Sequence, residues 1–418
     1  MANGERVRGV RSGHSGRTVT RRTAALWLAT ALVPACTAAP EASHHTVDSV
    51  QETLNARAAA LLDRDEEAFL ASCGPEQSEL RAEERRQFRN LADVPIGEWA
   101  YRVGTVRRDG AKAYADVELH YRIADYDTAP VVVARAMELG LRDGRWYVTA
   151  DRPAKGTAQQ LWQQGPVAAV HGQRSLVLAV GQQPDRLRAL ADTTDRAVPA
   201  VSRAWRSPWA ERVVVLVPPS LEGMGALLGS EGAGYRGIAA VTTGETGGTH
   251  AVPADRVIVN PGAYDALDRY GQQVVLTHET THVATRARTT PTTPMWLSEG
   301  FADWVAYRDT ARTTGQIAPE IQRAVRSGDL PDALPTEADF SFGSDPETLA
   351  VAYEGGWLAC EFIVGRWGEQ ALLELYHAVG RQRGDPAGAV DRELSRVLDM
   401  DTAEFTARWR DYLRQRLD

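Results

Sequence analysis

The chain contains 418 residues, of which 43% are hydrophobic and 24% are charged, and its formal net charge is −8. This length and composition predict two globular domains. Because the charge balance is acidic, the sequence argues against nucleic acid as a partner and against a basic surface that would bind anionic lipid headgroups.

The first 35 residues have the layout of a secretory signal. Arginines precede an apolar run from Ala24 to Ala35 that is too short to span a bilayer. We therefore expect residues 1–35 to be removed on export; losing their six arginines and one glutamate takes the formal charge to −13. The Arg21-Arg22 pair is also a feature of twin-arginine export signals, but the residues after it match such a signal poorly. Export by the general secretory route is therefore favoured.

The signal ends in the run Leu32-Val33-Pro34-Ala35-Cys36, which resembles a bacterial lipobox. The resemblance implies that Cys36 is lipidated, becomes the mature amino terminus and anchors the exported protein to the outer face of the cytoplasmic membrane. Pro34 departs from the small residue usual at its position. The alternative is an ordinary cleavage site followed by an unmodified thiol.

Residues 36–45 are expected to form a tether, and residues 46–158 to form the first domain. Apolar residues at helical spacing predict a helix from His45 to Leu62. A second short helix is expected through Phe69 and Leu70. The first domain thus begins with helices.

Strands follow these helices. Residues 113–121 alternate between apolar and polar side chains, and the pairs Asp109-Gly110 and Asp143-Gly144 are typical of tight turns between strands. Helices followed by an antiparallel sheet resemble the NTF2-like cone, whose curved sheet can enclose a pocket. A spacer or packing partner for the second domain is favoured over a separate enzyme.

Two cysteines, Cys73 and Cys360, remain in an exported chain, where disulfides persist. A bridge between them would link the two domains. Cys360 lies in an apolar helical stretch where a buried free thiol is the ordinary outcome, so both states stay open.

Residues 165–418 are expected to form the second domain, which opens with strands and a long helix. The predicted elements are a strand from Ser175, a helix from Pro184 to Ala204, a strand from Arg212 to Val217, and strands from Gly237 to Thr243 and from Arg256 to Asn260.

Residues 278–282 read His-Glu-Thr-Thr-His. On a helix, histidines four residues apart face the same side, so His278 and His282 can hold one metal ion while Glu279 lies beside them as a base. A chance occurrence on a helix surface is the alternative. A second carboxylate motif downstream argues against it.

That second motif is the run Trp296-Leu297-Ser298-Glu299-Gly300-Phe301-Ala302-Asp303. A catalytic zinc ion takes three protein ligands and keeps a fourth position open, and Glu299 would complete that set. Pro294 can occupy the first turn of a helix capped by Thr293, which sets Glu299 and Asp303 on one face. Asp303 is the carboxylate expected to accept the second N–H of a ligating imidazole, although a solvated helix aspartate is the alternative.

The surroundings of the motif can also be predicted. The opposite stripe of the histidine helix is expected to pack inward, and the linker from Thr289 to Pro294 to form an exposed rim loop. The stripe consists of Leu276, Thr280, Val283 and Ala287.

From about residue 170 to its end, the chain resembles the gluzincin branch of zinc metallopeptidases, most closely the peptidase MA-like proteins of high-GC Gram-positive bacteria. A metzincin would need a glycine and a third histidine where Thr285 and Arg288 stand. The resemblance implies that an extended substrate lies along an edge strand, for which Gly237 to Thr243 is the candidate. No Gly-x-Met-Glu-Asn segment for a substrate amino terminus is present, which favours an endopeptidase over an aminopeptidase.

Beyond the motif the sequence is helical to its end. Tyr353 stands where the family often has a tyrosine that reaches the cleft, which implies a donor to the oxyanion; a buried structural tyrosine is the alternative. Two apolar stripes are expected to be core: Leu372, Leu375, Tyr376 and Val379, then Phe405, Trp409 and Leu413.

The sequence thus predicts a mixed α+β zinc metallopeptidase with one zinc ion per chain, acting on peptides or proteins at the membrane. A zinc-bound water attacks the carbonyl while Glu279 takes its proton and passes it to the departing amine. The alternatives are a non-catalytic zinc-containing lipoprotein that binds a ligand or partner through its NTF2-like domain, and an endopeptidase held latent by that domain. The sequence indicates no oligomeric state.

Overall fold

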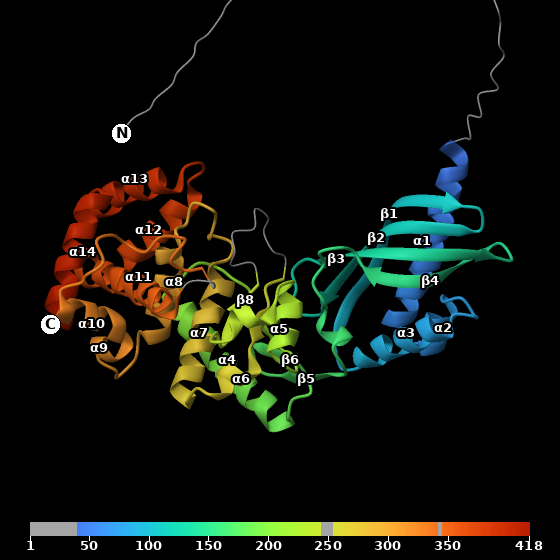
Figure 1. The fold of residues 1–418 in the computed structure, drawn as a ribbon, viewed down its shortest axis with the longest axis horizontal. Coiled ribbons are helices and arrows are strands. Elements are labelled where there is room, and N and C mark those ends of the chain that lie inside the picture. Colours follow the sequence, from blue (N-terminus) through green and yellow to red (C-terminus); the bar gives the residue numbers. More distant parts are fainter. Residues whose placement is uncertain (1–39, 244–253, 342–344) are drawn as a thin grey trace, which may run out of the picture.

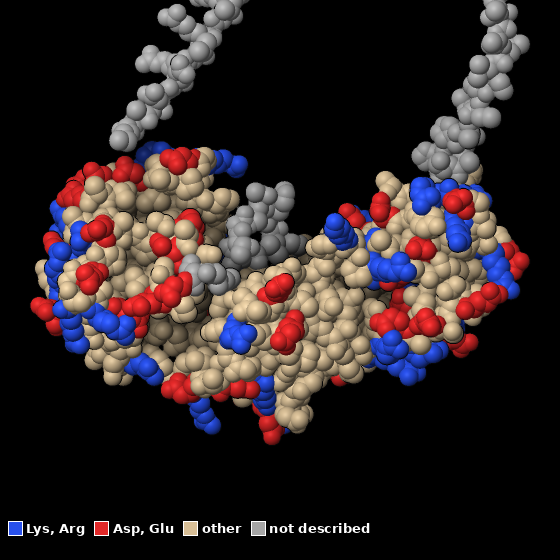
Figure 2. Space-filling view, in the orientation of Figure 1, with Lys and Arg blue, Asp and Glu red and all other residues tan. Residues whose placement is uncertain are grey.

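The computed structural model describes residues 40–243, 254–341 and 345–418, so the predicted signal segment and Cys36 lie outside the described residues. Figure 1 shows a sheet with helices at one end, a second sheet in the middle and a group of helices at the other end. On the face drawn in Figure 2, acidic and basic side chains are interspersed over both ends, and fewer charged side chains lie over the middle. No helix in the described part of the chain has both the length and the hydrophobicity needed to cross a bilayer.

The first region consists of three helices followed by a four-stranded antiparallel sheet in the order β1-β2-β3-β4. A turn lies at both predicted places; the first is shifted by one residue, to Gly110 and Ala111, because Asp109 still pairs with Lys112. At the second, Asp143 and Gly144 have φ angles of 49° and 79° and join strands paired through Arg142 and Arg145, which is the geometry of a two-residue hairpin turn. The elements are α1 (Pro40–Leu62), α2 (Glu66–Ala71), α3 (Ser78–Asn90), β1 (Ile96–Asp109), β2 (Lys112–Ile123), β3 (Val131–Arg142) and β4 (Arg145–Pro153).

Two details of this region differ from the sequence-based expectation. The predicted tether is too long, because α1 already begins at Pro40; proline fits the first turn of a helix, where its missing N–H is not needed. Helix α3 was not predicted. Its sequence is mostly charged, and only Glu84 and Phe88 are buried on it, so it lacks the apolar stripe that signals a helix.

The second region is built on a five-stranded sheet in the order β5-β6-β7-β9-β8. Strands β6, β7 and β9 are parallel, while β5 and β8 run antiparallel at the two edges. Strand β5 was not predicted, and α4 has the predicted bounds. The elements are η1 (Leu161–Gln163), β5 (Val167–His171), β6 (Ser175–Val180), α4 (Pro184–Ala204), β7 (Val213–Val217), α5 (Leu221–Leu228), η2 (Gly232–Tyr235), β8 (Ala240–Thr242), β9 (Val257–Val259), α6 (Pro261–Asp265) and α7 (Arg269–Thr285).

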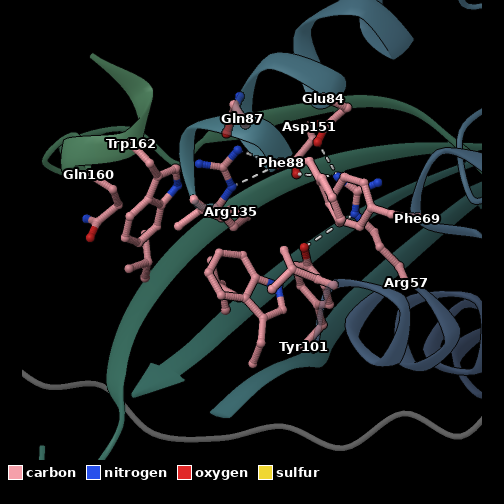
Figure 3. A pocket seen from close by; sticks show the side chains of 15 residues that line it. Arg57, Phe69, Glu84, Gln87, Phe88, Tyr101, Arg135, Asp151, Gln160 and Trp162 are labelled. Atoms are coloured by element: carbon pink, nitrogen blue, oxygen red, sulfur yellow. Dashed lines mark hydrogen bonds and ion pairs between the residues drawn. The ribbon is translucent and has the colours of Figure 1, made fainter. Parts of the chain in front are cut away.

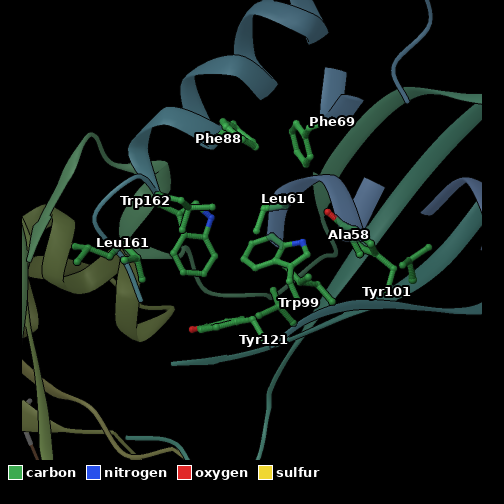
Figure 4. Close-up of a cluster of buried hydrophobic side chains, with 14 of the residues drawn as sticks. Ala58, Leu61, Phe69, Phe88, Trp99, Tyr101, Tyr121, Leu161 and Trp162 are labelled. Atoms are coloured by element: carbon green, nitrogen blue, oxygen red, sulfur yellow. The ribbon is translucent and has the colours of Figure 1, made fainter. Parts of the chain in front are cut away.

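The two faces of this sheet pack against different partners. Alternate strand residues such as Val177 and Val215 pack with α4 and with Leu276 of α7. Their neighbours Leu178 and Leu216 face the other way and join the core of the first region. Figure 4 shows this shared core around Trp99, Tyr121, Leu161 and Trp162. The two predicted domains are therefore joined through one buried cluster.

The C-terminal helices form a separate core, and the two predicted apolar stripes on α12 and α14 are confirmed as buried. The helices are α8 (Met295–Tyr307), α9 (Thr314–Ile317), α10 (Pro319–Ser327), α11 (Pro346–Trp367), α12 (Glu369–Arg381), α13 (Pro386–Leu398) and α14 (Thr402–Leu417).

Cys73 and Cys360 are both free and buried, so the bridge between them does not form. Cys360 belongs to the core of the C-terminal helices, whereas Cys73 lies beside Arg57 of α1 in the first region. Burial raises the pKa of both thiols, as expected for unreactive core cysteines.

Candidate metal centre

Helix α7 carries both motif histidines. Asp268 caps it by accepting a hydrogen bond from the backbone N–H of Gly271 at 2.7 Å. Leu276 and Thr280 are buried on its inner stripe, as predicted. Ala287 is exposed, and its predicted place in that stripe is wrong because the helix ends at Thr285.

The linker between α7 and α8 differs from the predicted exposed loop. Thr292 and Thr293 are buried, and the Thr292 hydroxyl donates to the carbonyl of Val379 at the end of α12 (2.9 Å). Thr293 does not cap α8; the N-cap is Pro294, and the Thr293 hydroxyl accepts from the backbone N–H of Thr290 instead. Hydroxyls that satisfy backbone groups allow the second half of the linker to be buried, while Pro291 is exposed.

Helices α8 and α11 cross with their backbones in contact. A Cβ atom added to Gly300 would overlap the carbonyl group of Gly356, and one added to Gly356 would lie 2.8 Å from the carbonyl oxygen of Trp296. Only glycine permits such an approach. The same two helices carry Glu299 and Tyr353, which lie beside His278 of α7.

The three predicted metal ligands converge. The Nε2 atoms of His278 and His282 lie 3.0 Å apart, and Oε2 of Glu299 lies 3.1 Å from the first and 3.3 Å from the second. Bonds of about 2.0–2.1 Å to a tetrahedral zinc ion place neighbouring donor atoms ~3.3 Å apart. The spacing of the donor atoms therefore fits zinc.

Asp303 holds one of these imidazoles. Its Oδ1 lies 2.8 Å from Nδ1 of His278, so that nitrogen is the donor and Nε2 turns its lone pair toward the other two ligands. Burial alone would lower the pKa of His278, but Asp303 and Glu299 raise it well above its ordinary value. Burial would raise the pKa of Glu299, but His282 and His278 hold it well below its ordinary range. Both shifts have one cause, the close approach of the Glu299 and Asp303 carboxylates to the two imidazoles.

Glu279 is 6% exposed and has a partner that the sequence did not identify. The hydroxyl of Thr242 lies 2.7 Å from Oε2 of Glu279 and 3.1 Å from its backbone carbonyl oxygen. Thr242 ends β8, which confirms a strand within the predicted range Gly237 to Thr243 and at an edge of the sheet. The available sequence signal for this contact was Thr242 itself, a polar residue in a strand that packs against the histidine helix.

Tyr353 is half-buried on α11 and lies beside the same centre. Its ring centroid is 6.1 Å from that of His278, and the ring packs at 5.3 Å against Phe340 in an edge-on arrangement. The structure thus brings together all six residues predicted for the site within the described chain.

The interior of the first sheet was the other candidate site. Arg57 pairs with Glu84, and Arg135 pairs with Asp151 at 2.6 Å, so the charges that face the interior are neutralised in pairs (Figure 3). The remaining cavity has a volume of about 20 Å³, close to that of a single water site. A small-molecule ligand does not fit this interior as it stands.

Comparison with known proteins gave structural matches only: no protein-family model and no curated protein matches the sequence. An M1 zinc metallopeptidase from Deinococcus radiodurans is 17% identical and covers 65% of this chain and 58% of its own, with a TM-score of 0.34. The yeast LTA4 hydrolase is 13% identical and covers 66% of this chain and 42% of its own, with a TM-score of 0.33. The matched region spans less than two thirds of either protein. At these TM-scores the likeness establishes neither the fold nor the activity of this chain.

Proposed function

We propose that this protein is a zinc metallopeptidase that binds one zinc ion through His278, His282 and Glu299 and uses Glu279 as its general base. The observation that carries the proposal is the triangle of donor atoms, 3.0–3.3 Å on each side, beside a buried carboxylate. Structural zinc sites usually have four protein ligands. In the described part of the chain this metal-binding group has three, which leaves a position for substrate.

The residues around the metal have distinct chemical tasks. When bound, zinc would supply a Lewis acid for the scissile carbonyl and would acidify a water molecule. Glu279 takes a proton from the attacking water and passes it to the departing amine, with its carboxylate oriented by the Thr242 hydroxyl. Tyr353 donates to the oxyanion, and Asp303 keeps His278 in the tautomer that binds metal.

The substrate is a peptide bound in extended form along β8. This strand pairs with β9 on one side, and no strand of the described chain pairs with its other side. The three residues of β8 are only 0–6% exposed, so a peptide that adds to this side through main-chain hydrogen bonds must first gain access to the strand edge. Without a Gly-x-Met-Glu-Asn segment to hold an amino terminus, cleavage within a chain is favoured.

The location and the first region complete the proposal. Export and a lipid anchor at Cys36 rest on residues 1–36, and the NTF2-like character of residues 46–158 rests on the order of its elements. The first region acts mainly as a packing partner, because it covers one face of the second sheet. Its removal would expose Leu178, Leu216 and Ile258, so a simple latency segment is not favoured.

Peptide libraries with free and with blocked amino termini test the activity and its mode. We expect the soluble chain from residue 37 to cleave both libraries and to lose this activity when a chelator removes zinc. Cleavage of free-terminus peptides alone would identify an aminopeptidase. No cleavage of either library by the zinc-loaded protein would favour the non-catalytic alternative.

A further inference from the structure

The first region reaches the candidate active site through a buried ion pair. Asp127 follows β2, and its two carboxylate oxygens accept hydrogen bonds from both terminal nitrogens of Arg256, each at 2.7 Å. The side chains of the two residues are 1% and 8% exposed. A bidentate pair at this depth fixes the relative position of the two chain segments that carry it.

Arg256 stands at the end of β8, where the candidate substrate strand stops. Its backbone N–H donates to the Thr243 hydroxyl at 2.9 Å, and its carbonyl oxygen accepts from the Thr243 N–H at 2.8 Å. Thr243 follows Thr242, whose hydroxyl contacts Glu279. Only two residues therefore separate Asp127 from the contact with the proposed base.

A second arginine ties the same point to the histidine helix. Arg286 directly follows α7, and its guanidinium donates to Asp255 at 2.9 Å and to the carbonyl oxygen of Thr243 at 2.8 Å. Asp255 and Arg256 are adjacent, so one pairs with the end of α7 and the other with the first region. The end of β8 is thus held from two sides.

We propose that Asp127 is a positioning residue of the peptidase, through which the first region fixes the end of β8 for binding of extended peptides. This rests on the proposed function, since it assigns part of the substrate-binding geometry to a residue outside the second region. Asp127 reaches the strand pair through its ion pair with Arg256, which directly precedes β9, so its effect passes through Thr243 to β8.

The physical reason is the cost of a buried unpaired charge. Asp127→Asn keeps the shape of the side chain but leaves the Arg256 guanidinium without its carboxylate. Arg256 and its backbone would move to recover solvation or another partner, and Thr243 would move with them. The metal ligands lie on α7 and α8, so zinc binding should be unchanged in this variant.

A matched control exists in the first region. Arg135 and Asp151 form a similarly buried ion pair at 2.6 Å, with both side chains 7% exposed, but they contact neither β8 nor β9. Asp151→Asn removes the same charge from a buried arginine pair, in which Asp151 also lies 3.9 Å from Arg57. Both variants should unfold at lower temperature than the wild type.

The test compares the KM of short peptides with that of peptides long enough to pair along the whole of β8. For Asp127→Asn we expect the KM of long peptides to rise about tenfold while the KM of short peptides changes less than about twofold. Asp151→Asn should leave the ratio of the two KM values as in the wild type. Equal ratios in the two variants would overturn the proposal.

A measurement without turnover separates this inference from the proposed function. Hydrogen–deuterium exchange at residues 240–243 should be faster in Asp127→Asn than in Asp151→Asn at conditions where both are folded. If the wild type cleaves no peptide but this difference is found, the peptidase assignment fails and the positioning of β8 stands. Equal exchange in the two variants would contradict the positioning itself.

Discussion

Gly300 of α8 and Gly356 of α11 meet backbone to backbone, with no room for a Cβ atom on either. The contact fixes α8, which carries Glu299, against α11, which carries Tyr353, and both residues lie beside His278 of α7. Gly300→Ala should force the helices apart, lower the free energy of unfolding by about 1–3 kcal/mol and weaken zinc binding. Denaturant unfolding and zinc titration measure the two effects.

Gly365→Ala is the control for that substitution. Gly365 lies on the same helix α11, and a Cβ atom there would meet nothing within 4 Å. It should be neutral or stabilise the protein by about 0.5–1 kcal/mol, because alanine is the better helix former. If both variants unfolded alike, the close crossing would not be a constraint.

Asp303→Asn tests the support given to His278. Asparagine can still accept from Nδ1–H, but it lacks the charge that favours this tautomer and strengthens the imidazole as a ligand. We expect zinc affinity to fall by about 10–100-fold with little change in helical content. Competition with a chromogenic chelator gives the affinity. Unchanged zinc affinity would show that Asp303 does not support His278 as a ligand and is only a solvated aspartate on a helix.

Thr242 is expected to matter through its hydroxyl. Thr242→Val keeps the shape but removes the hydrogen bond to Glu279, and kcat should fall about tenfold or more, since hydrogen bonds to charged groups contribute about 1.5–3 kcal/mol. Thr242→Ser retains the hydroxyl and should recover most of the rate. Equal rates for the two variants would show that the hydroxyl has no part in orienting the base.

Glu354 predicts a pH dependence of stability. Burial raises the pKa of this carboxyl from 4.5 to about 7, although it accepts hydrogen bonds from the backbone N–H groups of Ile321 and Glu320. The folded state therefore binds the proton more tightly than the unfolded state, and the stability from this group is present below pH 4.5 and lost as the pH rises through 7.

Glu354→Gln removes that titration. The difference in free energy of unfolding between variant and wild type should shift in favour of the variant as the pH rises from 4.5 to 7. Urea denaturation at several pH values measures it. A difference that stays constant across this window would show that the carboxyl titrates alike in both states.

The sequence predicted those parts of the site that depend on local spacing. His278, Glu279 and His282 share one helix, and Glu299 and Asp303 share another, so helical geometry alone orders each set. The meeting of the two helices was inferred from the chemistry of zinc. In the structure α8 packs directly on α7 through contacts of Asp303 and Glu299 with His278, which no spacing within either helix reveals.

Contacts between residues distant in the sequence could not be predicted in this way. Thr242 is 37 positions from Glu279, and Asp127 is 129 positions from Arg256. The prediction of an exposed linker was wrong for the same reason. Thr292 is polar and lies between two prolines, which is typical of exposed loops, but its hydroxyl donates to the distant carbonyl of Val379. Each of these contacts is a hydrogen bond between residues that only the tertiary fold brings together.

The most direct test is the zinc content and peptide hydrolysis of Glu279→Gln beside the wild type. Glutamine is nearly isosteric and can still accept from the Thr242 hydroxyl, but it cannot take a proton from water. We predict one zinc ion per chain in both proteins and hydrolysis in the wild type only. Full hydrolytic activity in the zinc-loaded variant would contradict the assignment of Glu279 as the base.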